Sequence, residues 1–152
     1  MCGEACHSTR LSSGGTIAVL RSPHDPTGQP VANEPVASCD LLFDNPASPC
    51  NPRTRAVLRA RDGVSVDGLK TYFMLIHRDG DLRTRASMGD EVRTALHAIE
   101  LKPAVDEHQN HARMDLPEAL DLCVGTARGV IGRRVSIVRG GERVAEGIIG
   151  YN

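Results

Sequence analysis

The feature that most constrains the fold is a short, uninterrupted apolar run at Tyr72–Ile76, inside the stretch Leu69–Leu101. A run of this length, closed by the polar turn residues Arg78–Asp81, is typical of a buried strand followed by a tight turn. Residues Leu82–Ala86 then alternate apolar and polar side chains, which favours a returning strand with one solvated face. The sequence therefore predicts a hairpin in the middle of the chain.

A helix is expected directly after this hairpin. Ser87 is a suitable N-cap for a helix that begins near Met88, and acidic residues follow in its first turn. Apolar residues recur at helical spacing as far as Ile99, and Pro103 would end the helix. A strand at Val92–Leu101 is the alternative interpretation of the same residues.

A longer helix is predicted to follow Asp115, which is a suitable N-cap. Pro117 would occupy the first turn and Glu118 the capping-box position. Either Gly129 or Gly132 would end this helix. Its apolar stripe would comprise Leu116, Ala119, Leu120, Cys123, Val124, Ala127 and Val130.

The C-terminal residues predict a second hairpin, with alternating side chains in Val135–Arg139, a turn at Gly140-Gly141 and a return over Val144–Ile149. The order hairpin, helix, helix, hairpin favours an α+β fold. In this fold an antiparallel sheet built from two hairpins carries helices packed on one face. A Pro/Cys-rich N-terminal arm would precede the sheet.

The composition changes near residue 52. Residues 1–52 hold seven of the nine prolines and four of the five cysteines, and their net charge is −3 against +2 for residues 53–152. We therefore expect two parts: an arm at 1–52 with one or two short strands, and a compact α+β domain at 53–152. Thr16–Leu20 and Pro35–Phe43 are the candidate strands of the arm.

Five cysteine and histidine residues of the arm form one candidate metal site. Thiolate and imidazole groups are good zinc ligands, and four of them complete a tetrahedral site. Zinc is the cofactor that this set would hold, with scattered free thiols as the alternative. The candidate ligands are Cys2, Cys6, His7, Cys39 and Cys50.

The opening Met1-Cys2-Gly3 resembles the start of glutamine amidotransferases, and the resemblance covers these three residues. It implies that removal of Met1 would expose the thiol and the α-amine of Cys2 together. N-terminal nucleophile amidohydrolases use that pairing, with the amine as general base.

A second candidate metal site lies in the polar segment 106–115. On a helix, His108, His111 and Asp115 would share one face. Two imidazoles and a carboxylate can bind a divalent metal and leave coordination positions open for a substrate. The alternative is a solvated polar loop, with Asp115 acting as the cap of the following helix.

Arginines mark a third candidate site, for polyanions. The segment 53–61 alternates in a way that places four arginines on one face of a strand, and two more from the central hairpin could adjoin them. Such a strip could bind phosphates or an acidic partner, although RNA-binding sheets usually add stacking aromatic residues. The alternative is a solvated sheet face. The arginines are Arg53, Arg55, Arg59, Arg61, Arg83 and Arg85.

The composition indicates the location of the protein and the kind of genome that encodes it. The chain has no run of 18 apolar residues and no basic-then-apolar start, so we expect a cytoplasmic protein without a membrane segment. A net charge of −1 gives no general attraction to nucleic acid. Sixteen arginines against two lysines are typical of a GC-rich genome, bacterial or phage.

No catalytic signature stands out, so the leading hypothesis is a small non-catalytic binding, accessory or assembly module. It would act through protein–protein contacts of the arm or of an exposed sheet edge, and self-association into a homo-oligomer belongs to the same hypothesis. The first alternative is a metal-dependent enzyme that uses the cluster near 106–115. The second is a phosphate or nucleic-acid binder that uses the arginine-rich strand.

Overall fold

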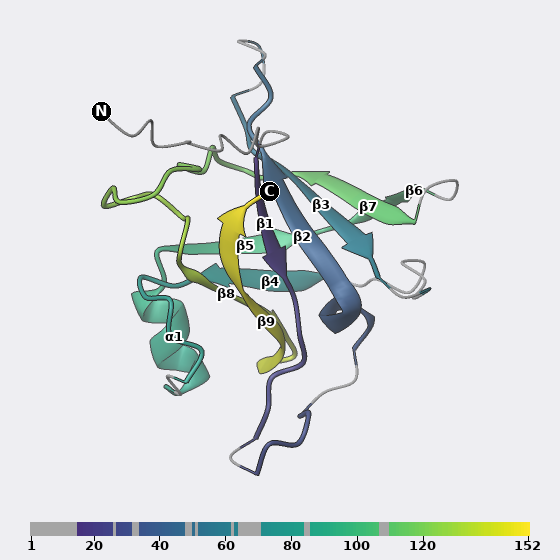
Figure 1. Cartoon of the computed structure of the whole chain (residues 1–152), viewed down its shortest axis with the longest axis vertical. Coiled ribbons are helices and arrows are strands. Elements are labelled where there is room, and N and C mark those ends of the chain that lie inside the picture. Colours follow the sequence, from purple (N-terminus) through teal and green to yellow (C-terminus); the bar gives the residue numbers. More distant parts are fainter. Residues whose placement is uncertain are drawn as a thin grey trace, which may run out of the picture.

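The computed structural model describes residues 15–25, 27–31, 34–47, 50, 52–61, 63, 71–83, 86–106 and 110–152, without the side chains of Val105 and Asp106. Within these residues the chain is mostly antiparallel β-structure, with a single α-helix (Figure 1). The strands are β1 (Thr16–Val19), β2 (Cys39–Asp44), β3 (Arg55–Ala60), β4 (Tyr72–Ile76), β5 (His97–Leu101), β6 (Ala104–Asp106), β7 (His111–Asp115), β8 (Arg134–Arg139) and β9 (Glu142–Tyr151). The helices are α1 (Met88–Thr94) and the 3-10 helix η1 (Pro35–Ser38).

The nine strands form one sheet in the order β5-β4-β8-β9-β1-β2-β3-β7-β6. The two strands at its ends follow each other in the chain, since only Lys102 and Pro103 separate β5 from β6. One bent segment therefore pairs with β4 through its first half and with β7 through its second half. The sheet consequently curls into a barrel-like shape that is nearly closed.

The interior of this curled sheet is filled by every second side chain of the strands. Leu41 and Phe43 of β2, for example, are buried beside Ala56 and Leu58 of β3. Alternation with period two is what a sheet with one buried face requires. The further members of the interior include Ala18, Tyr72, Met74, Ile76, Ile99, Leu101, Ala112, Val135, Ile137 and Ile149.

The predicted α+β fold, with helices packed on one face of a two-hairpin sheet, is wrong. The long helix expected after Asp115 does not form, because the backbone of this segment bonds to distant residues. Leu116 N donates to Thr54 O at 2.8 Å, and Leu120 N donates to Thr54 Oγ1 at 2.7 Å. Asn45 Nδ2 donates to Leu120 O at 2.9 Å. Leu116 and Leu120 are buried as expected, but they lie in an irregular segment and not in a helix.

The helix expected from Met88 exists but is short. Asp90 N donates to Ser87 Oγ at 3.3 Å, which confirms the N-cap. The helix ends at Thr94, and His97–Leu101 forms strand β5 beside β4, so the alternative interpretation holds for these residues. No helix in the described part of the chain is long and apolar enough to cross a membrane.

The central hairpin is a second error, whereas the C-terminal hairpin is confirmed. Strand β4 pairs with β5 and β8, and no strand lies among the described residues of 82–86. A Cβ atom on Gly80 would lie 2.2 Å from Gly132 O, so close backbone contact favours glycine there. The turn between β8 and β9 uses Gly140 and Gly141 with φ of 59° and 80°, as a tight hairpin requires.

The described N-terminal residues belong to the sheet and form no separate arm. Strand β1 pairs with β9 and β2, and β2 pairs with β3, so both strands lie near the middle of the sheet order. This corrects the arm of the predicted fold. Independent folding of residues 53–152 stays a prediction.

Candidate functional site

The outside of the sheet has two parts, which we name the covered face and the open face. The covered face consists of the outward side chains of β4 and β8 other than Phe73, which is 52% exposed, and α1 lies beside these strands (Figure 1). Leu75 and Ser136 belong to it and are buried, although both point away from the interior. The open face consists of the outward side chains of β1, β2, β3, β7 and the end of β9. Val19 of this face is 40% exposed.

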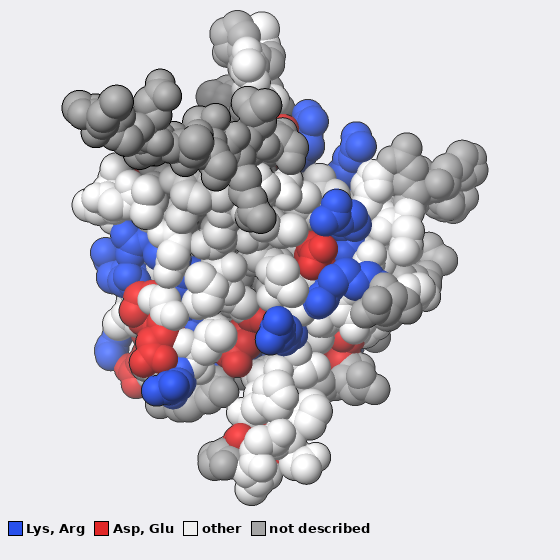
Figure 2. All heavy atoms as spheres, viewed as in Figure 1, with Lys and Arg blue, Asp and Glu red and all other residues white. Residues whose placement is uncertain are grey.

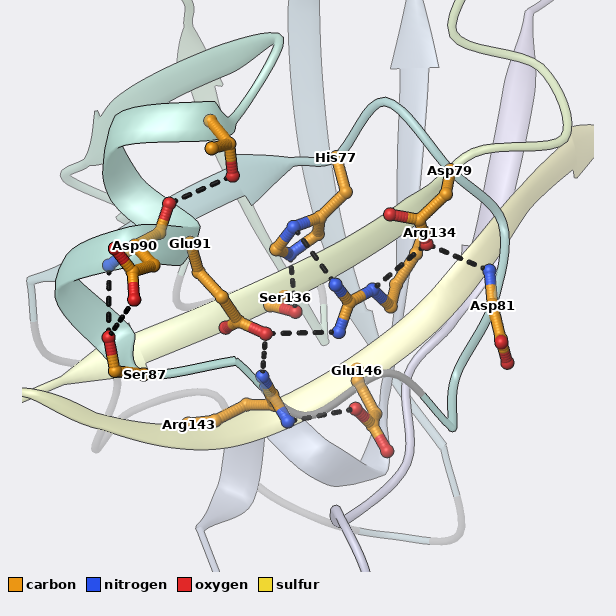
Figure 3. Close-up of polar contacts among 11 residues, drawn as sticks. His77, Asp79, Asp81, Ser87, Asp90, Glu91, Arg134, Ser136, Arg143 and Glu146 are labelled. Atoms are coloured by element: carbon orange, nitrogen blue, oxygen red, sulfur yellow. Dashed lines mark hydrogen bonds and ion pairs between the residues drawn. The ribbon is translucent and has the colours of Figure 1, made fainter.

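A buried charge network fixes α1 to the covered face (Figure 3). Glu91 Oε1 of α1 accepts a hydrogen bond from Arg134 Nη1 of β8 at 3.2 Å and another from Arg143 Nη2 of β9. Arg143 Nη1 also lies 3.8 Å from Glu146 Oε2. Because Glu91 and Arg134 are each only 1% exposed, each charge depends on the other for compensation.

His77 and Ser136 form a pair inside this network, with 2.9 Å between Nε2 and Oγ. Arg134 Nη2 lies 3.2 Å from the other ring nitrogen, Nδ1, and an arginine can only donate. Nδ1 therefore accepts, and Nε2 carries the proton and donates it to Ser136 Oγ. Burial, and then the charge of Arg134, lower the pKa of His77 to about 4. A serine nucleophile needs the opposite arrangement, in which the imidazole accepts its proton, so this pair is structural.

The open face carries a regular array of side chains across β2, β3 and β7. Strand pairing places three rows in register, each with one residue from every strand. Two charged rows thus flank a row that is mainly apolar. The rows are Asp40, Arg59 and His111; Leu42, Val57 and Arg113; and Asp44, Arg55 and Asp115.

The ion pairs on the open face have exposed arginine side chains, although Asp40 itself is buried. Arg59 Nη2 lies 3.2 Å from Asp40 Oδ2, and Arg55 Nε lies 3.9 Å from Asp115 Oδ1. Arg113 differs, because its Nε donates to His111 Nε2 at 3.1 Å. Among the described side chains, no carboxylate oxygen lies within 4.0 Å of the Arg113 guanidinium nitrogens.

Two grooves border the apolar residues of the open face. The first, of about 600 Å³, is lined by Ile17, Val19 and Ile148 together with Leu82 and Glu146. The second, of about 330 Å³, is lined by the array on β2, β3 and β7. Figure 2 shows this side of the molecule, with pale surface over β1 and β9 and Lys and Arg side chains gathered over β2 and β3.

The predicted ligands of the second metal site are separated where the structure describes them. His111 and Asp115 lie at opposite ends of β7. Four residues of extended chain span about 13 Å, whereas one helical turn would have brought them together. His108 lies outside the described residues, so the three-residue site stays a prediction.

The two described cysteines of the first metal site differ in burial. Cys39 is buried, and burial raises the pKa of its thiol to about 11. Cys50 is exposed, while Cys2, Cys6 and His7 lie outside the described residues. No group of three or more His, Cys, Asp or Glu residues suited to a metal ion occurs within the described part of the chain.

The arginine strip is brought together in part. Arg55 and Arg59 point to the open face, and Arg53 is exposed just before β3. Arg61 reaches the same face with Nε, which lies 3.1 Å from Asp40 Oδ1, while its Nη2 donates to Ala37 O at 3.3 Å. Arg83 lines the first groove, and Arg85 lies outside the described residues.

Sequence reasoning missed Arg113 and Asp40 as members of this face. The alternation of His111, Arg113 and Asp115 is the available signal, but the sequence analysis predicts a helical metal site or a polar loop here, with Asp115 as the cap of the following helix. No protein-family model matches this chain, and no curated protein matches it significantly. Its role has therefore to be inferred from its own geometry.

Proposed function

We propose that this chain is a non-catalytic binding module that acts through protein–protein contacts of its open face. One observation carries the proposal: Ile17, Leu42 and Val57 stand side by side in register across β1, β2 and β3 on the outside of the sheet. An apolar centre rimmed by charged residues is the usual anatomy of a protein interface. Arginine is also enriched at such interfaces.

The topology favours contact through a face and not through strand addition. Strand addition needs an accessible sheet edge. Here the two end strands, β5 and β6, are consecutive in the chain, and the sheet nearly closes on itself. Curling of this kind shortens the edges that a partner strand could use.

The test is a selection of peptides on the whole chain, followed by binding measurements on matched variants. Val19→Glu places a charge on the open face, whereas Val92→Glu makes the same change on α1, where valine is 48% exposed. We expect the selected peptides to bind the wild-type chain saturably in fluorescence anisotropy. Val19→Glu should weaken binding about tenfold or more, since a buried charge at an interface is costly, and Val92→Glu should leave it unchanged.

Circular dichroism would confirm that both variants are folded. Equal binding to the wild-type chain and the Val19→Glu variant would contradict the proposal. So would a selection that yields no peptide with saturable binding.

A further inference from the structure

Three guanidinium groups gather around one apolar residue of the open face. Val57 of β3 lies opposite Arg113 of β7 in the strand pairing, and Arg55 and Arg59 flank it on the same face of β3. Diagonal neighbours on adjacent strands have Cα atoms about 7–8 Å apart, within reach of long side chains. All four residues line the groove of about 330 Å³.

The three arginines differ in the ion-pair and hydrogen-bond partners that they already have. Arg59 and Arg55 each have a carboxylate on a neighbouring strand, namely Asp40 and Asp115. Arg113 uses its Nε to donate to the imidazole of His111, whose Nε2 must therefore be unprotonated. No hydrogen bond joins the terminal Nη atoms of Arg113 to a described residue. This end of the guanidinium is a bidentate donor for an incoming anion.

The charge balance around the site selects the size of that anion. Four arginines meet three aspartates here, and Asp40 lies within 4.0 Å of both Arg59 and Arg61. The arginines are Arg55, Arg59, Arg61 and Arg113, and the aspartates are Asp40, Asp44 and Asp115. A polyanion would meet these aspartates along with the arginines, whereas a single carboxylate can reach Arg113 alone.

The residues beside Arg113 indicate which kind of molecule carries the anion. Aliphatic side chains of Val57, Leu42 and Ile17 continue across the sheet from Arg113. Single-stranded nucleic acid is usually bound by aromatic stacking platforms, and this row has none. An extended protein segment with an acidic side chain beside apolar ones fits the row better.

We propose that Arg113, supported by Arg55 and Arg59, binds the carboxylate of an acidic side chain in an extended segment of a partner protein. This inference rests on the proposed function, because it assigns the chemistry of the ligand to the same face. His111 is a positioning residue, since it holds the guanidinium of Arg113 through Nε.

The test compares two fluorescent peptides with blocked ends. The Gln–Val peptide alternates Gln and Val throughout, and the Glu–Val peptide differs from it by a single central Glu in place of Gln. Anisotropy titrations with the whole chain should show that the Glu–Val peptide binds about fivefold more tightly, the size expected for one partly exposed charge pair. Arg113→Ala should abolish this preference, and Arg113→Lys should keep only part of it, because lysine retains the charge without the planar fork. Arg93→Ala is the matched control, since Arg93 is exposed on α1.

Several results would overturn the inference. They are equal affinity for both peptides, no binding of the Glu–Val peptide, or an equal loss in the Arg93→Ala variant. Tighter binding of a single-stranded oligonucleotide would assign the site to nucleic acid. A dimer in light scattering that Arg113→Ala dissociates would assign the face to a second copy of the chain.

The two proposals fail separately. If the Gln–Val peptide binds as well as the Glu–Val peptide but Val19→Glu weakens both, the carboxylate site is excluded and the protein-binding face stands. If Val19→Glu leaves the binding of the selected peptides unchanged, the proposed function is contradicted, whatever the effect of substituting Arg113.

Discussion

The covered face and the open face place arginine–carboxylate pairs on the outside of the same sheet, but at very different depths. The side chains of Arg134 and Glu91 are each 2% exposed, whereas those of Arg55 and Asp115 are 41% and 48% exposed. On the covered face the charges compensate one another out of water and hold a helix in place. On the open face water screens the charges, so the same residue types remain available for exchange with a partner.

The largest expected difference between the two faces concerns removal of a charge. Glu91→Gln would leave Arg134 and Arg143 buried without their shared carboxylate. We expect the free energy of unfolding to fall by about 3–5 kcal/mol, as for other broken buried pairs. Urea denaturation followed by circular dichroism measures this loss.

The matched change on the open face is Asp115→Asn, which breaks the pair with Arg55. It should alter stability by less than about 1 kcal/mol, because the pair is exposed. Similar losses in both variants would erase the distinction between the faces.

A second comparison uses apolar side chains that both point outward from the sheet. Leu75 is 1% exposed on the covered face, and Val19 is 40% exposed on the open face. Leu75→Ala should cost about 2–5 kcal/mol through the cavity it creates. Val19→Ala should cost less than about 1 kcal/mol. Thermal unfolding of both variants is the measurement, and a larger loss for Val19→Ala would show that the open face is part of the packed structure.

The last expected difference depends on pH and comes from the covered face. The pKa of His77 is lowered from 6.5 to about 4 in the folded protein, so between these values the unfolded chain binds the extra proton. Stability should therefore fall as the pH falls from about 6.5 to about 4, by up to about 3 kcal/mol. His77→Gln can keep both hydrogen bonds without titrating, and its stability should depend less on pH across this window. Parallel pH profiles of the two proteins would exclude His77 as the cause.

Local patterns were predictable where a single segment supplies its own partners. The Ser87 cap binds Asp90 N three residues away, and the hairpin turn at Gly140-Gly141 joins adjacent strands. Both are short-range interactions, and propensity describes them well. The prediction of a helix after Asp115 was wrong because backbone N–H groups of that segment donate to Thr54, more than sixty residues earlier.

Only part of the candidate site was predictable from the sequence. Alternation alone places Arg55 and Arg59 on one face of β3. Their neighbours Asp40 and Arg113 come from β2 and β7, and the pairing register that brings them there depends on the whole sheet. A shift of one residue would turn every one of these side chains to the other face.

The sequence by itself determined an aliphatic interior, the identity of most strands, one helix start and the C-terminal turn, because period and turn chemistry act over a few residues. Tertiary structure alone decided that β1 and β2 complete the sheet, that β5 and β6 nearly close it, and that α1 covers one outer face and leaves the other open. The physical reason is that apolar burial is non-directional: it requires every strand to find a partner without specifying which. Arginines on the outside of the sheet could therefore have been buried or exposed, and the tertiary packing around each strand separated the two cases.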